Sequence, residues 1–91
     1  MTRLGIDYAA VSARNPRIVY CSISAFGQDG PYKYRPAHDL AVEALSGGIG
    51  LTLGADDKPA IPGVAIADMV SSLQSLAGIM MALYRRTITD K

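Results

Sequence analysis

Residues 17–25 read Arg-Ile-Val-Tyr-Cys-Ser-Ile-Ser-Ala and carry the strongest β-strand signal of the chain. Apolar side chains follow one another almost without a break from Ile18 to Ile23, where a half-exposed strand would alternate apolar and polar residues. A run of this kind is typical of a strand that is buried on both faces of a parallel sheet. The stretch therefore predicts an α/β fold.

This strand has few candidate partners in the rest of the chain. A lone strand cannot satisfy its own backbone N–H and C=O groups, so it needs neighbours. Residues Gly50 to Leu53 are the best of a weak set of further strand candidates. We therefore expect a mostly helical α/β segment with one or two short strands.

The clearest helix of the sequence covers residues 68–86. Asp68 at its start and Arg85 and Arg86 at its end both suit the helix dipole. Its most apolar part, residues 69–84, contains three serines and a glutamine and is shorter than the ~20 residues of a membrane span. We therefore expect no membrane contact. The apolar residues recur at i, i+3 and i+4 spacing, at Met69, Leu73, Leu76, Met80 and Leu83.

Two shorter helices and two loops complete the expected organisation. A helix over residues 4–15 should end at Asn15-Pro16, and a helix over residues 38–45 should stop at Ser46-Gly47-Gly48. The Gly- and Pro-rich loop 27–36 follows the carboxyl end of the predicted strand, where open α/β sheets place their ligand sites. A second loop, 54–62, should turn at Asp56-Asp57.

Composition excludes some functions. The 91 residues are enough for one domain at most, and they carry a net charge of +1 with scattered Lys and Arg. That distribution argues against a nucleic-acid partner. The lone Cys21 favours a reducing, cytoplasmic setting, and its apolar neighbours predict a small buried hydrophobe rather than a nucleophile.

Three polar residues stand out as candidates for chemistry: His38, Asp39 and Asp68, each at the start of a predicted helix. Asp is a preferred helix N-cap, so capping explains both carboxylates without any catalytic role, and His38 has a structural alternative too. The functional alternative is that a carboxylate and an imidazole act on one substrate as acid, base or nucleophile. The spacing alone does not choose between them, and no metal-binding or nucleotide-phosphate motif occurs.

Several blocks in order resemble class III CoA-transferases, a family that includes formyl-CoA and carnitine-CoA transferases and alpha-methylacyl-CoA racemase. The blocks cover most of the chain, and their ordered set is more specific than any one of them. They are Asn15-Pro16-Arg17-Ile18-Val19-Tyr20, Ser22 to Pro31, Ala37-His38-Asp39-Leu40, Ala44-Leu45-Ser46-Gly47, Ile66-Ala67-Asp68 and Ala82 to Thr87.

The resemblance implies roles for the three candidates. In the transferases, an Asp matching Asp68 attacks the acyl-CoA carbonyl and passes through anhydride and thioester intermediates. In the racemases, a His matching His38 and an Asp matching Asp68 exchange the proton next to the thioester carbonyl. His38 favours the racemase chemistry, because transferases more often carry an aromatic residue there. Asp39 would then lie near the pantetheine arm of CoA, and no metal is implied.

The resemblance also implies that residues 1–91 are an internal segment of a Rossmann-like enzyme, matching its central catalytic part. The N-terminal CoA-binding region and the C-terminal domain of the family have no counterpart in the sequence. We therefore expect no full activity from the segment alone. The alternatives are a non-catalytic oligomerising or binding module derived from the family, and an unrelated helical adaptor. Because a chain this short has few ways to bury its strand and its long helix, we expect a dimer or larger assembly.

Overall fold

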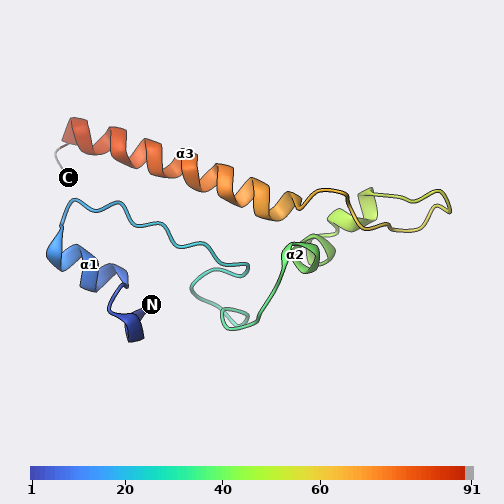
Figure 1. Ribbon diagram of the computed structural model, residues 1–91, viewed down its shortest axis with the longest axis horizontal. Coiled ribbons are helices and arrows are strands. Elements are labelled where there is room, and N and C mark those ends of the chain that lie inside the picture. Colours follow the sequence, from blue (N-terminus) through green and yellow to red (C-terminus); the bar gives the residue numbers. More distant parts are fainter. Residues whose placement is uncertain (90–91) are drawn as a thin grey trace. The chain divides into compact units, whose positions relative to one another are not determined.

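A computed structural model describes residues 1–89 of the chain. Three α-helices are formed, α1 (Tyr8–Arg14), α2 (Asp39–Ser46) and α3 (Ile66–Thr89), which Figure 1 colours blue, green and orange to red. Two short 3₁₀ helices, η1 (Thr2–Leu4) and η2 (Gly48–Leu51), precede α1 and follow α2. The described part of the chain is therefore helical.

The predicted strands are wrong for residues 1–89, which contain no β-strand. Residues 18–24 have neither helix nor sheet pairing, although their sequence favours a buried strand. The weaker candidate, Gly50 to Leu53, falls partly in η2, and Leu53 forms only an isolated antiparallel bridge with Pro59. A strand exists through its neighbours, and this segment has no second run to pair with.

The first predicted helix is split. Gly5 adopts a left-handed φ of 66° and ends η1, after which Asp7 caps α1 by accepting a 3.0 Å hydrogen bond from the N–H of Ala10. Asn15 follows as the C-cap, which confirms the predicted end of this helix.

Helix α2 agrees closely with its prediction. His38 occupies the N-cap position, and Gly47, at φ 84°, ends the helix in the left-handed conformation that glycine adopts most easily. The predicted stop at Ser46-Gly47-Gly48 is therefore confirmed. The predicted turn at Asp56-Asp57 is also present, closed by a 2.8 Å bond from the N–H of Gly54 to the carbonyl of Lys58.

Helix α3 is longer than predicted. It begins two residues before Asp68 and continues to Thr89, 24 residues in all, so the argument that it is too short to span a membrane is wrong. Its mean hydropathy of 1.4 over the most apolar stretch would allow a span by length and composition alone, as it would for the core helix of a soluble protein. The serines within it remain the polar interruption that the sequence shows.

The chain forms two compact units. One consists of residues 1–21 and 75–91, in which the Tyr20 hydroxyl donates to the carbonyl of Ile6 at 3.0 Å and the Arg86 guanidinium donates to the carbonyl of Arg17 at 2.6 Å. The other consists of residues 22–74 and holds all three candidate site residues.

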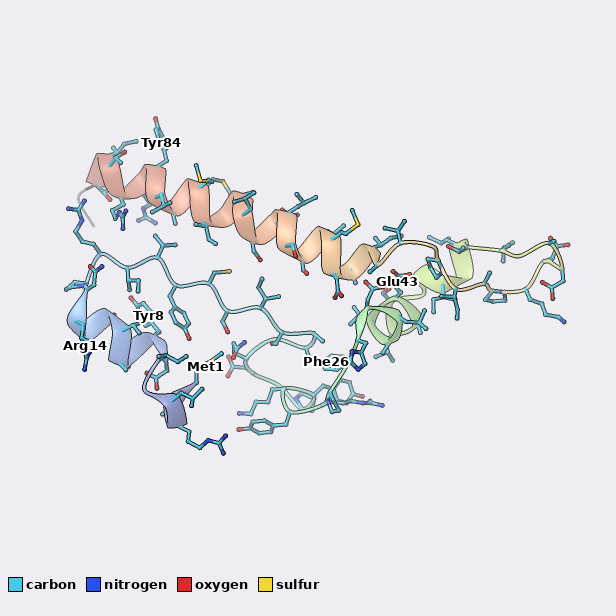
Figure 2. All side chains as sticks on the ribbon, in the orientation of Figure 1. Met1, Tyr8, Arg14, Phe26, Glu43 and Tyr84 are labelled. Carbon is cyan, nitrogen blue, oxygen red and sulfur yellow. The ribbon has the colours of Figure 1, made fainter. Side chains whose placement is uncertain are left out.

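Neither unit has an apolar core within the described residues, where Glu43 is the single buried side chain. Large apolar side chains are exposed instead, as Tyr84 illustrates at 70% exposure where it projects from α3 (Figure 2). Cys21 is exposed as well, so the prediction that it is a buried hydrophobe is wrong. Apolar surface on this scale is typical of a chain that is covered by other protein.

The cap of α1 leads to a first testable prediction. The N–H of Ala10, and then the Thr2 hydroxyl, hold the pKa of Asp7 below its ordinary value. Because the folded-state pKa is lowered, the cap should stabilise α1 above that pKa and be lost as pH falls through it. Carbon NMR of the Asp7 carboxyl and proton NMR of the Ala10 amide should report one shared midpoint. An Ala10 amide that titrates unchanged in the Asp7→Asn variant would contradict the assignment.

Candidate functional site

The three predicted site residues lie in the unit formed by residues 22–74. His38 and Asp39 stand at the start of α2, and Asp68 lies in the first turn of α3. His38 and Asp68 line the same hollow of about 300 Å³. The other residues of its wall are Ile23, Ser24, Ala25, Ala37, Val42, Ala67 and Ser71. The structure therefore places at one hollow a histidine and an aspartate that lie 30 residues apart in sequence.

Asp68 is the third residue of α3, so the interpretation that it is the N-cap of this helix is wrong. The residue before the helix is Ala65, whose carbonyl accepts the N–H of Met69 at 3.0 Å. Asp68 uses its backbone in hydrogen bonds, accepting the hydroxyls of Ser71 and Ser72 on its carbonyl. Its side chain is exposed and its carboxylate has no hydrogen-bond partner among residues 1–89. That carboxylate is free to meet a substrate.

Asp39 caps a helix, but a different one from that expected. Its Oδ1 accepts the backbone N–H of Asp68 at 2.9 Å, so its carboxylate serves the first turn of α3 rather than of its own helix α2. The bond joins residues 29 positions apart. The predicted place of Asp39 near the pantetheine arm of CoA stays a prediction.

His38 occupies the N-cap position of α2 with extended backbone angles, φ −115° and ψ 169°. Its side chain makes no capping hydrogen bond and is exposed. The imidazole therefore does not cap the start of α2. His38 lines the hollow that it shares with Asp68.

Glu43 is a further residue of this region that the sequence reasoning missed. It is 6% exposed, and its Oε1 accepts the N–H of Ile66, the first residue of α3, at 3.1 Å; Figure 2 labels it on α2. A usable signal was present, because Glu43 is the only glutamate of the chain and lies four residues after Asp39. Two residues with this spacing share one face of a helix.

The described residues contain no group of three or more His, Cys, Asp or Glu side chains that could hold a metal ion. The chemistry that the arrangement offers is that of an unbonded carboxylate in the first turn of a helix, at a hollow whose wall also includes a histidine. The positive end of the helix dipole favours negative charge at this place. A carboxylate there can act as a nucleophile or as a base.

Comparison with known proteins identifies the family of the chain. The whole sequence, residues 1–91, matches CoA-transferase family III. It is 40% identical to the acetyl-CoA:oxalate CoA-transferase of Acetobacter aceti, over 100% of this chain and 24% of that protein. It is 37% identical to the succinate–glutarate CoA-transferase of Agrobacterium fabrum, over 91% of this chain and 21% of that protein.

A solved structure agrees with the sequence matches. The crystal structure of a CaiB/BaiF family protein from Brucella suis superposes with a TM-score of 0.91 at 39% identity, covering 99% of this chain and 24% of that one. The chain belongs to CoA-transferase family III, which confirms the resemblance read from its sequence blocks. It spans between a fifth and a quarter of the length of these relatives.

Proposed function

We propose that the chain is the catalytic segment of an enzyme that transfers CoA between carboxylic acids, with Asp68 as the nucleophile. The observation that carries this proposal is the free carboxylate of Asp68. Two other carboxylates, those of Asp39 and Glu43, cap the helix that Asp68 helps to begin. Capping of α3 therefore does not explain why an aspartate stands at position 68.

The reaction follows from what a carboxylate does to a thioester. An oxygen of Asp68 attacks the acyl-CoA carbonyl carbon, the C–S bond breaks, and CoA leaves as a thiolate. The resulting mixed anhydride is attacked by that thiolate at the Asp68 carbonyl, which releases the first carboxylic acid and leaves CoA bound to Asp68 as a thioester. A second carboxylic acid then reverses the two steps and takes the CoA. Each oxyanion formed on the way needs N–H donors nearby.

The relatives support transfer as the leading reaction. The proteins from Acetobacter aceti and Agrobacterium fabrum are named CoA-transferases, acting between acetyl-CoA and oxalate and between succinate and glutarate. We therefore infer an acyl-CoA thioester and a carboxylic acid as the substrates, with Asp39 near the pantetheine arm. Because the chain spans a quarter of such enzymes or less, the activity is that of the complete protein and not of these residues alone.

Epimerisation of a 2-methylacyl-CoA is the second candidate, and one observation favours it. His38 lines the same hollow as Asp68, and no capping bond uses its side chain. An acid and a base on opposite sides of a carbon next to a thioester carbonyl are the groups that such a reaction needs. A non-catalytic module remains the alternative from another class.

The variant His38→Gln separates the two reactions. It should be made in a complete family member that carries His38 and Asp68 at the matching positions. If the enzyme transfers CoA, the variant should keep turnover within about tenfold and keep an Asp68-linked intermediate that hydroxylamine traps. If it is a racemase, exchange of the 2-proton from one substrate face should fall by about 10²-fold or more, because one acid–base group is lost.

Uptake of solvent deuterium into the acyl-CoA, measured by mass spectrometry, reports this difference directly. The matched control is Tyr34→Phe, an exposed loop position that lies outside the hollow. Deuterium uptake that disappears in His38→Gln and persists in the control would contradict the transfer proposal and establish proton exchange.

A further inference from the structure

Glu43 is the one buried side chain of residues 1–89, and its burial needs a reason. A carboxylate withdrawn from water costs free energy unless hydrogen bonds compensate it. Here Oε1 accepts the N–H of Ile66 at 3.1 Å. This bond is the compensation for burial, and it ties the buried carboxylate of α2 to the start of α3.

Glu43 acts together with Asp39. The two residues lie one turn apart on α2, so their carboxylates leave the same face of that helix. They accept the N–H groups of the first and third residues of α3, Ile66 and Asp68, which have no partner within their own helix. A helix end held by one bond can pivot about it, whereas two bonds to one rigid neighbour define its direction. With Asp68 already bonded to Asp39, the bond from Ile66 to Glu43 stops the start of α3 from pivoting.

We propose that Glu43 is a positioning residue for the reaction of Asp68. By holding Ile66, it keeps the first turn of α3 in the one orientation that places Asp68 in the wall of the hollow shared with His38. This inference rests on the proposed function of Asp68. Geometry matters at this level, because a reacting group displaced by about 1 Å can lose about 10²-fold in rate.

A purely structural cap would behave differently. Removing it would weaken the protein, and the folded fraction would react at the parental rate. Removing a positioning residue instead lowers kcat in fully folded enzyme, while KM for the acyl-CoA stays the same because the substrate contacts are intact. The split between kcat and KM therefore distinguishes the two roles.

The test uses a complete family III CoA-transferase that carries Asp39, Glu43 and Asp68 at the matching positions. Three variants of Glu43 are compared at a temperature where circular dichroism shows each to be fully folded. E43A removes the acceptor and should lower kcat by about 10- to 100-fold with KM within about threefold. E43D keeps the charge but shortens the reach, and should lose a similar factor. E43Q keeps Oε1 in place and should recover kcat to within about fivefold of the parent.

The control is Asp56→Asn, which removes an exposed loop carboxylate that pairs with Lys58 at 3.4 Å and should leave kcat unchanged. Folded E43A and E43D enzymes with parental kcat would overturn the proposal, as would a loss confined to KM or a Gln variant as slow as the Ala variant. Should E43A not fold, E43D decides. If neither folds, Glu43 is structural and the proposal fails.

Asp68→Asn in the same series separates this inference from the proposed function. An active Asn variant refutes the nucleophile and the positioning role together. An inactive Asn variant beside parental Glu43 variants leaves the nucleophile in place and refutes only the positioning role.

Discussion

Replacement of Asp68 by Asn should lower turnover by at least about 10²–10⁴-fold while the protein keeps its fold. Loss of acid–base assistance alone accounts for a factor of this size, and loss of a nucleophile costs no less. The substitution keeps the shape of the side chain and removes only the charge and the attacking oxygen. It should be made in a complete family member with Asp at this position and assayed with an acyl-CoA and a carboxylic acid acceptor.

The structure makes this experiment cleaner than the sequence suggests. Asp68 is not the N-cap of α3, and the N–H groups at the helix start are held by Asp39 and Glu43. The Asn variant should therefore change stability by no more than about a few tenths of a kcal/mol, within the range of exposed substitutions. Any large loss of turnover would then come from loss of the reacting carboxylate and not from loss of the fold. The exposed carboxylate of Asp56 supplies the matched Asn control.

Two readouts decide the outcome. Turnover measures the rate, and hydroxylamine trapping followed by mass spectrometry measures the Asp68-linked intermediate, which the Asn variant should lack. An Asn variant with full activity would refute the catalytic role of Asp68 and leave the non-catalytic module as the better explanation of the chain.

The isolated 91-residue chain should sediment as a dimer or a larger species at micromolar concentration. Its described residues bury no apolar side chain. The apolar stripe of α3 is largely open to solvent, because its members Met69, Leu73, Leu76 and Met80 are each more than half exposed. Burying a Leu or Met side chain contributes about 1.5–3 kcal/mol, so covering several of them by a second copy outweighs the entropy of association at such concentrations. Sedimentation velocity measures this directly.

A lysine placed in the apolar stripe of α3 tests whether this stripe causes the association. Leu73→Lys should shift the equilibrium towards monomer by roughly tenfold or more, because association would bury an ammonium group. Gln74→Lys adds the same charge at the neighbouring exposed position and should change the equilibrium much less. A compact monomer of the parental chain at micromolar concentration would refute self-association.

Prediction from sequence succeeded where structure is local. The ends of α2 and α1 were found at Gly47 and Asn15, because a left-handed glycine and a helix terminator act on the residues beside them. The stripe of α3 was found from its period, although the helix extends beyond both predicted ends. The sequence also singled out His38 and Asp68 as candidates; the structure places both residues at one hollow, and their chemical roles stay a prediction.

Prediction from sequence failed where the structure of a residue depends on a partner far away in the chain. Residues 17–25 favour a buried strand but have no strand to pair with in residues 1–89, so their preference is not realised. The capping of α3 was assigned to Asp68, whereas the caps come from Asp39 and Glu43, 29 and 23 residues from the N–H groups that they accept.

The sequence by itself determined the helices, most of their ends and the family, and it singled out His38 and Asp68 as candidates. Only the tertiary structure decided which carboxylates are hydrogen-bonded. Those of Glu43 and Asp39 accept the backbone N–H groups of Ile66 and Asp68, whereas the carboxylate of Asp68 accepts none from the described residues. The physical reason is that helix periodicity and capping propensity act over a few residues. A hydrogen bond between two helices, in contrast, exists only once packing brings the start of α3 against the face of α2.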